Sequence, residues 1–303
     1  MPVAVEDTLT VISFSMFHGK NHGKKGGLMK TREELEEFAK QIRIDVVNMS
    51  MNSKKTGAHI GGAFSAAEIL AVLYGSVSNV YPNDPENEYR DRIILSKSHA
   101  AVALYSALCQ VGFIPRDDID NAMMGESELY KHPKKSIERG IECSGGSLGM
   151  GLSFAVGIAQ GLKLKNNSEA RVFVILGDGE CNEGSVWEAA ASIIHYQLNN
   201  ITTIVDVNKY QIDGSTEEVV NAGDTAGRWA SLGFDVVEVD GHDVMRLQEE
   251  FSKKRGAPTV ILCDTVKGKG VSFTENRVEW HIGRLSEEQA EQALEELKSV
   301  ITE

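Results

Sequence analysis

The chain has 303 residues, of which 42% are hydrophobic, enough apolar material for one large or two ordinary globular domains. Its 44 acidic and 31 basic side chains leave a formal net charge of −13, which argues against general attraction to nucleic acid or to an anionic membrane. No run approaches the ~20 apolar residues of a membrane span. The four cysteines form no Cys-x-x-Cys pair, which favours a reducing cytoplasm.

The first thirty residues differ in composition from the rest of the chain. A short apolar patch over 9–17 lacks preceding basic residues, so we do not expect a signal peptide. Residues 18–30 are rich in glycine and lysine and can bury little apolar area. We therefore expect a mobile tail over 1–30 and, because no Pro/Gly/Ser-rich linker follows, one domain over 31–303.

Regular patterning begins at Thr31, where Thr31 and Glu34 have the spacing of a capping box and apolar residues recur at helical spacing as far as Met49. Further helices are predicted over 65–74, 100–111, 151–163, 186–196, 243–253 and 286–301. Runs rich in β-branched residues predict strands over 92–95, 172–176, 201–207, 236–239 and 259–263. This alternation predicts an α/β fold, a doubly wound and mostly parallel sheet with helices on both faces.

Three histidines in the first half of the chain lie in suggestive surroundings. His59 precedes a run of small residues, and the alternative is a loop histidine that caps the following helix. His99 lies where a predicted strand runs into a helix, and backbone N–H groups and an imidazole there suit a phosphate oxygen. His132 is followed by a proline and two lysines, so a surface histidine is an open alternative.

A glycine-rich run, Ser144 to Gly151, opens the predicted helix over 151–163 and contains Gly146 and Leu148. Glycines allow a flat ring to approach the backbone without interference from a Cβ atom. Helix–sheet packing at a glycine-rich helix start is the alternative interpretation.

The most informative feature is the turn formed by Gly177, Asp178 and Gly179 after one predicted strand. Asn208 and Tyr210 follow the next predicted strand. Parallel strands bring such residues to the carboxyl edge of a sheet, where open α/β sheets bind ligands. A hard divalent cation takes carboxylate, amide and backbone oxygens and completes its shell with phosphate oxygens. The side chains of Asp178 and Asn208 and the carbonyl of Tyr210 are therefore predicted metal ligands.

An ordinary Asp-Gly turn is the alternative to this metal-diphosphate clamp, while the glycine spacing is too long for a dinucleotide fingerprint. Glu183 and Glu188 follow the turn, and two glutamates near a helix start can simply complement the helix dipole. Further on, Asp243 is predicted to cap a helix, and the preceding His242 is interpreted as structural.

These segments resemble the transketolase family and follow the same order, from about Thr31 to His281. The resemblance includes a Lys-Gly-Lys-Gly run from Lys267 and a Trp-His pair that ends at His281. The resemblance implies thiamin diphosphate with Mg²⁺ or Ca²⁺. It implies cofactor contacts by His59, His99, Gly146, Leu148, Gly177, Asp178, Gly179, Glu183, Asn208 and His281. It implies catalytic roles for His59, His99, His132 and His281 and for a carboxylate network of Glu183 and Glu188 across a subunit interface.

The resemblance also implies transfer of a two-carbon ketol unit from a ketose or ketose phosphate to an aldose. In the family the activating glutamate lies in a second, pyrimidine-binding domain, so we expect the N-terminal subunit of a split transketolase. Its partner would be a C-terminal subunit, in a two-plus-two heterotetramer acting on a sugar or sugar phosphate. Alternatives are the matching subunit of another thiamin diphosphate enzyme, such as a 2-oxo-acid dehydrogenase or a secondary-metabolism synthase, and a noncatalytic cofactor-binding subunit.

Overall fold

The computed structural model describes residues 29–53 and 57–299. Five strands form one parallel sheet in the order β1-β2-β3-β5-β4, which confirms the predicted α/β fold. The strands are β1 (Arg92–Leu95), β2 (Val172–Gly177), β3 (Ile201–Val207), β4 (Asp235–Asp240) and β5 (Thr259–Asp264). Of the expected tail, residues 1–28 lie outside the described part of the chain.

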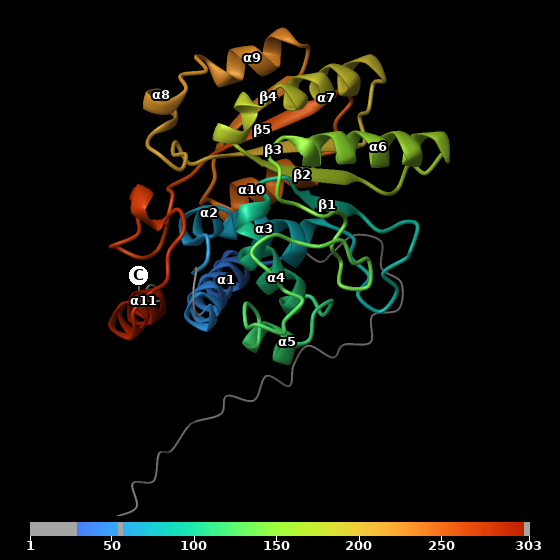
Figure 1. Ribbon diagram of the computed structural model, residues 1–303. Helices are drawn as coiled ribbons and strands as arrows, with labels where there is room; N and C mark the ends of the chain where they lie inside the picture. The colour runs from blue at the N-terminus through green and yellow to red at the C-terminus, as the bar shows by residue number, and fades with distance from the viewer. Residues whose placement is uncertain (1–28, 54–56, 300–303) are drawn as a thin grey trace, which may run out of the picture.

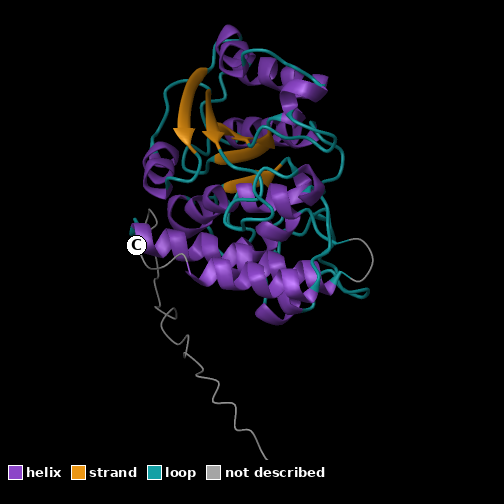
Figure 2. Cartoon of the chain, turned by 90° about the vertical axis from the view of Figure 1, so that its left-hand side faces the viewer, coloured by secondary structure: helices purple, strands orange, loops and turns teal. Residues whose placement is uncertain are grey.

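Helices cover both faces of the sheet (Figures 1 and 2). On one face lie α6 (Met150–Leu164), α7 (Gly184–His195) and α9 (Thr225–Ser231), with α8 (Thr216–Val219) nearby. On the other lie α1 (Arg32–Asn52), α2 (Ile60–Ser65), α3 (Ala67–Val72), α4 (Ala101–Gln110), α5 (Arg116–Asp120) and α10 (Val244–Ser252), and α11 (Glu287–Ser299) packs beside α1. In the described part of the chain, no helix has both the length and the apolar composition to span a membrane.

The side chains of β2 show why its sequence is an unbroken apolar run. Phe173 and Ile175 join the core beneath α1 to α4, whereas Val172, Val174 and Leu176 join the core beneath α6 and α7. Successive side chains of a strand point to opposite faces. Because both faces are covered by helices, every residue of β2 is buried and no polar alternation remains.

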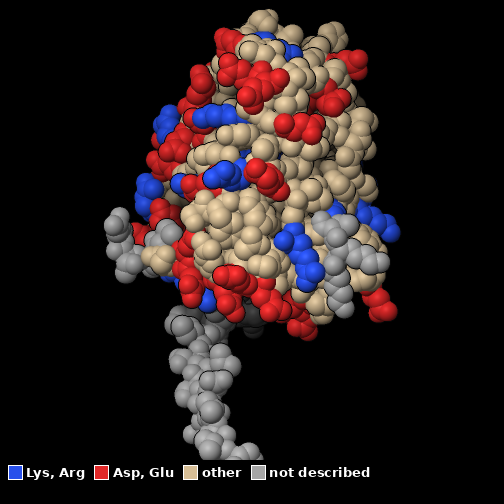
Figure 3. Space-filling model, turned by 60° about the vertical axis from the view of Figure 1, so that its left-hand side comes forward, with Lys and Arg blue, Asp and Glu red and all other residues tan. Residues whose placement is uncertain are grey.

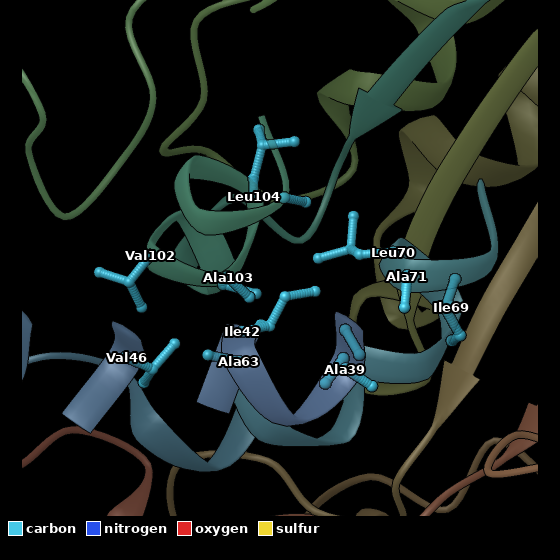
Figure 4. Packing of buried hydrophobic residues seen from close by; sticks show 14 of the residues in the cluster. Ala39, Ile42, Val46, Ala63, Ile69, Leu70, Ala71, Val102, Ala103 and Leu104 are labelled. Atoms are coloured by element: carbon cyan, nitrogen blue, oxygen red, sulfur yellow. The ribbon is translucent and has the colours of Figure 1, made fainter. Parts of the chain in front are cut away.

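Helix α1 is the centre of the larger core. It begins with the predicted capping box, in which the Thr31 hydroxyl accepts from the Glu34 amide and the Glu34 carboxylate accepts from the Thr31 amide. Figure 4 shows its inner face packed against the helices that follow it in the chain, through Ala39, Ile42, Val46, Ala63, Leu70, Ala71, Val102, Ala103 and Leu104.

The helix predicted from residue 65 begins earlier, at Ile60, and is followed by α3 and a π-helical turn over Leu73–Val77. The difference arises at two glycines that would ordinarily disfavour a helix. A Cβ atom on Gly61 would lie 3.0 Å from the Lys267 Cγ, and one on Gly62 would lie 2.9 Å from the His99 Nε2. The glycines are therefore used for close packing against residues that are distant in the sequence.

A buried ionic network joins α1 and α3 to the loops after β4 and β5. The two Glu68 oxygens lie 2.7 Å from Arg43 guanidinium nitrogens, and His242 Nδ1 lies 3.0 Å from Glu68. His242 Nε2 accepts from the Val266 amide at 2.9 Å, so Nδ1 carries the proton. Burial opposes ionisation of Glu68, but Arg43 and His242 lower its pKa to about 2. His242 is thus structural, and Asp243 caps α10 as predicted.

Replacing Glu68 by alanine should lower the free energy of unfolding by about 3 to 5 kcal/mol, because it leaves the Arg43 charge buried without its partner. Glu249→Ala is the control, since Glu249 is exposed and pairs with Arg246 and Lys253 at the surface, where such pairs contribute little to stability. Urea unfolding of the two variants measures the difference. Equal losses in both would contradict the assignment of the network as a structural centre.

Candidate functional site

Four neighbouring strands deliver polar residues to the same edge of the sheet. His99 follows β1, Asp178 follows β2, Asn208 follows β3 and Lys267 follows β5. The pairing of Gly177 with Asp206 brings the ends of β2 and β3 level. Because all these strands are parallel, their carboxyl ends form one continuous edge, where open α/β sheets place their ligands.

A buried ion pair between Lys97 and Asp206 lies beneath this edge, and both side chains are fully shielded from solvent. Asp206 also accepts hydrogen bonds from the hydroxyls of Ser65, at 2.6 Å, and Thr265. The Asn208 amide donates to Ser65 Oγ at 3.3 Å and to Asp206 at 3.4 Å. One carboxylate thus links the ends of β1, β3 and β5 to α2.

The carboxylate of Asp178 is held by two backbone amides. Gly179 N donates to Oδ1 at 2.8 Å and Lys209 N donates to Oδ2 at 2.6 Å. Lys209 has φ 69°, a left-handed conformation that side chains rarely adopt. Burial, followed by the negative charge of Asp206, raises the pKa of Asp178 to about 6. A bound cation would favour the ionised form, so the surroundings of Asp178 suit a metal ion.

The predicted metal ligands Asn208 and Tyr210 lie beside Asp178 in the turn after β3. Asn208 is buried, and its Oδ1 accepts from the Tyr210 amide at 3.2 Å, which fixes the orientation of the side chain. Among the described residues, no group of three His, Cys, Asp or Glu side chains could hold a metal. A cation here would need one carboxylate, amide and carbonyl oxygens and oxygens from its ligand, the donor set that hard cations accept.

The structure brings together the four histidines predicted as site residues. The ring centroid of His59 lies 5.6 Å from that of His99, 5.5 Å from that of His132 and 5.4 Å from that of His281. The His99 and His281 centroids are 5.4 Å apart. Four segments that are distant in the sequence therefore supply one imidazole cluster, and His132 is part of it rather than a surface histidine.

An isolated antiparallel bridge places His59 beside His281. The amide of Ala58 donates to the Gly283 carbonyl at 2.9 Å, and the amide of Gly283 donates back at 3.0 Å. His59 occupies the N-cap position of α2 but makes no capping hydrogen bond, so the capping alternative is wrong. Its buried Nδ1 has no hydrogen-bond partner among the described residues, which is expected of a group that contacts a ligand.

Burial and nearby positive charge keep His59, His99 and His281 uncharged. Burial, with His281 and His132, lowers the pKa of His59 to about 3; burial, with Lys267 and Lys97, lowers that of His281 to about 4. Burial and then Lys97 hold the pKa of His99 well below its usual range. Acidic side chains are common over the face in Figure 3, whereas the interior of the site carries buried lysines.

Lys267 connects this cluster to the loop after β3. Its Nζ donates to the Gln211 carbonyl at 2.9 Å and lies 3.4 Å from His281 Nδ1. Burial, with Lys97 second, lowers the pKa of Lys267 to about 8. The buried Gln211 Nε2 has no partner in the described part of the chain. An anion between these groups would find several donors that are already in place.

The glycine-rich loop before α6 offers an open stretch of backbone. Gly146 has φ 145°, and a Cβ atom there would meet nothing within 4 Å. Leu148 beside it is half-buried. In contrast, a Cβ atom on Gly179 would lie 2.7 Å from Gln211 Cγ, so a side chain there would force Gln211 to move. The room at Gly146 fits the flat ring that the sequence predicts there.

Glu183 and Glu188 lie at the start of α7, and both are exposed. Glu183 occupies the N-cap position without a capping hydrogen bond. Their predicted participation in a carboxylate network across a subunit interface stays a prediction.

Sequence reasoning assigned no role to Lys97, Asp206 or Glu180, which hold the site together. A signal was present, because Lys97 follows the apolar run of β1 and Asp206 interrupts that of β3. Charged residues within such runs are buried only when they are paired. Their partners, however, are distant in the sequence and only the fold identifies them.

Residues 35–299 match the family described as "Transketolase, thiamine diphosphate binding domain". The chain belongs to the transketolase family. It is 40% identical over 268 residues to one of the subunits of apulose-4-phosphate transketolase of Actinobacillus succinogenes, covering 88% of this chain and 96% of the relative. It is 36% identical over 243 residues to a 6-deoxy-6-sulfo-D-fructose transketolase subunit of a Clostridium species, covering 79% of this chain and 88% of that relative.

Full-length transketolases are matched over less than half of their length. Human transketolase is 34% identical over 269 residues, which are 89% of this chain and 43% of the human protein. The crystal structure of Campylobacter jejuni transketolase superposes with a TM-score of 0.81 at 28% identity, covering 89% of this chain and 43% of that one. The chain thus corresponds to the N-terminal subunit of a two-chain transketolase, as predicted.

The neutral histidines should make stability depend on pH. The pKa of His59 and His281 is lower in the folded than in the unfolded chain, so the unfolded chain binds more protons between about pH 4 and 6.5. The free energy of unfolding is therefore unaffected by these histidines above about pH 6.5 and falls as the pH drops below it. Each such histidine contributes a slope of up to about 1.4 kcal/mol per pH unit. Urea unfolding between pH 7.5 and 5.5 should show a shallower slope for His59→Gln than for the wild type. An equally shallow slope in the exposed control His195→Gln would contradict this origin.

Proposed function

We propose that this chain binds thiamin diphosphate with Mg²⁺ or Ca²⁺ and, with a partner subunit, transfers a two-carbon ketol unit from a ketose to an aldose. The observation that carries the proposal is the convergence of four histidines at the sheet edge that also holds Asp178 and Asn208. Bound thiamin diphosphate supplies the carbanion chemistry, and the protein supplies positioning and proton handling.

The cation is assigned to the carboxylate of Asp178, the amide oxygen of Asn208 and the carbonyl of Tyr210. Support comes from the raised pKa of Asp178 and from the fixed orientation of the Asn208 side chain. Gly177 and Gly179 shape the turn that carries Asp178, and a side chain on Gly179 would collide with Gln211. On the ring side, the open backbone at Gly146 and the half-buried Leu148 are proposed to contact the cofactor.

The imidazoles are proposed to exchange hydrogen bonds and protons with the diphosphate and the substrate. His99 and His281 are assigned to the diphosphate side, and His59 and His132 to the substrate. A negative charge beside an imidazole raises its pKa, so an anionic ligand would move the depressed pKa values of His59 and His281 toward the neutral range. Proton exchange would therefore be efficient only in the loaded site, since a catalytic pKa works best near the working pH.

A sugar with an anionic group, such as a sugar phosphate, is the proposed substrate class. Two relatives are named for apulose-4-phosphate and for a sulfo-sugar. In this chain Lys131 precedes His132, and its positive charge adds to the effect of burial, which chiefly lowers the pKa of His59. Lys134 and Lys135 follow and are exposed. This basic segment beside the substrate histidine favours an anionic over a neutral sugar.

A C-terminal transketolase subunit with the pyrimidine-binding domain is the proposed partner, in a two-plus-two assembly. Support comes from two relatives that are themselves named as single subunits of a transketolase, which this chain covers over 95–96% of their length. Glu183 and Glu188 are exposed at the start of α7, where a partner could reach them. A cytoplasmic location is part of the proposal, since the four cysteines are all free.

The variant Asp178→Asn should weaken binding of thiamin diphosphate with Mg²⁺ at least on the order of tenfold, because it removes the carboxylate that holds the cation. In the wild type, affinity should fall as the pH drops through about 6, where Asp178 becomes protonated, and the variant should lose this dependence. Calorimetry on the complex with the partner measures both effects. Asp213→Asn, in the exposed loop that follows, is the control, and matching affinities in the two variants would refute the cation assignment.

Ketol transfer should require the partner subunit. The purified chain with saturating thiamin diphosphate and Mg²⁺ should show no turnover, and titration with the partner should restore it until the two are equimolar. A panel of ketose and aldose pairs, with and without phosphate, identifies the substrate class from kcat/KM. Full turnover without the partner would refute the two-subunit proposal, and equal kcat/KM for phosphorylated and neutral sugars would refute the anionic substrate class.

A further inference from the structure

Glu180 lies beneath the proposed cofactor site, although its side chain is an ionisable carboxyl group. It belongs to the 3₁₀ turn Gly179–Asn182 between β2 and α7, and only 2% of it is exposed. Buried carboxylates are rare and need hydrogen-bond donors around them. The hydrogen-bond donors around Glu180 therefore indicate its structural role.

Three donors from three different segments converge on this carboxylate. Oε1 accepts from the Ser96 hydroxyl at 2.5 Å and from the Gly149 amide at 2.8 Å. Oε2 accepts from the Gly177 amide at 3.1 Å. These donors lie after β1, in the glycine-rich loop before α6 and at the end of β2.

Each of the three segments carries a proposed cofactor contact. Ser96 lies three residues before His99, Gly149 follows the loop that contains Gly146, and Gly177 directly precedes Asp178. The ring side and the cation side of the site are thus joined through one side chain.

Packing around Gly149 explains why its position must be fixed. Gly149 has φ 79° and occupies the N-cap position of α6, where its amide has no partner within the helix. A Cβ atom there would collide with Ser185 Oγ. One on Gly151 would collide with Ser96 Oγ. The loop is therefore seated tightly on Ser96 and on the start of α7, and Glu180 supplies the acceptor for its amide.

We propose that Glu180 is a positioning residue that sets the ring-binding loop at a fixed place relative to the cation-binding carboxylate of Asp178. The inference rests on the proposed function, because the ring and the cation are parts of one cofactor. Glu180 itself does not contact the cofactor. It acts through the backbone of Gly149 and Gly177 and through Ser96.

The chemistry of the three donors requires a carboxylate at position 180. Gly149 and Gly177 donate to different oxygens, so both oxygens must accept. Glutamine has nearly the same shape but only one acceptor oxygen. Its NH₂ group would face the amide of Gly149 or of Gly177, and two donors repel one another. Glu180→Gln therefore breaks the hydrogen bond to one of these two amides, on one side of the site, while it changes the side-chain volume little.

The test compares two ligands of the complex with the partner subunit, thiamin diphosphate and inorganic diphosphate, each with Mg²⁺. Calorimetry should show that Glu180→Gln weakens thiamin diphosphate binding by about 10- to 100-fold, the usual effect of losing an outer support of a site. The affinity for inorganic diphosphate should fall several-fold less, because this ligand has no ring for the loop to position. Hydrogen exchange at the Gly149 amide should accelerate.

Two further variants make the result decisive. Ser96→Ala removes one donor and leaves the carboxylate with two amides, so it should show the same selectivity with a smaller loss, and it decides the matter if Glu180→Gln does not fold. Glu217→Gln, on the exposed surface of α8, should leave both affinities unchanged. Equal losses for the two ligands, or unchanged affinities in both Glu180→Gln and Ser96→Ala, would overturn the positioning role. Failure of the wild-type complex to bind thiamin diphosphate would instead refute the proposed function.

Discussion

The Lys97–Asp206 pair is the interaction on which the arrangement of the site depends. Both charges are removed from water, which carries a large desolvation cost, so the pair is weak evidence for stability. Its effect is geometric, because the same carboxylate also accepts from Ser65 and Thr265. Removing either charge would leave the other buried and would release the strand ends together. The strand ends at the sheet edge are therefore held in place by buried residues that need not contact a ligand.

The electrostatics of the site oppose those of the whole molecule. The chain carries a net charge of −13, yet Lys97 and Lys267 are buried beside the histidine cluster, and burial, followed by the charges of Lys267 and Lys97, lowers the pKa of His281. Positive charge in a place shielded from solvent acts strongly because little water screens it. An anion entering this region gains attraction that the outer surface does not offer. The local charges at the site, rather than the overall charge, thus bear on which ligands it favours.

The sequence predicted the sheet, and it identified residues that the fold brings together, for identifiable reasons. The strands are apolar runs between helical patterns, and the turn at Asp178 is a contiguous motif, so each can be recognised within a short window. The start of α2 was misplaced because glycines at 61 and 62 oppose a helix locally, and close packing overrides that tendency. The pairing of Lys97 with Asp206 and the contacts of Glu180 depend on residues far apart in the chain. Local patterns carry no information on such partners.

The bridge between Ala58 and Gly283 has a consequence for how the protein acquires its site during synthesis. It joins segments about 220 residues apart, so His59 meets His281 only after the ribosome has released the chain beyond Gly283. Contacts of such long sequence separation form late, because closing a long loop costs entropy before the contact is made. The sheet and its covering helices can assemble while the nascent chain is still growing. The histidine cluster can form only after both of these segments have emerged from the ribosome.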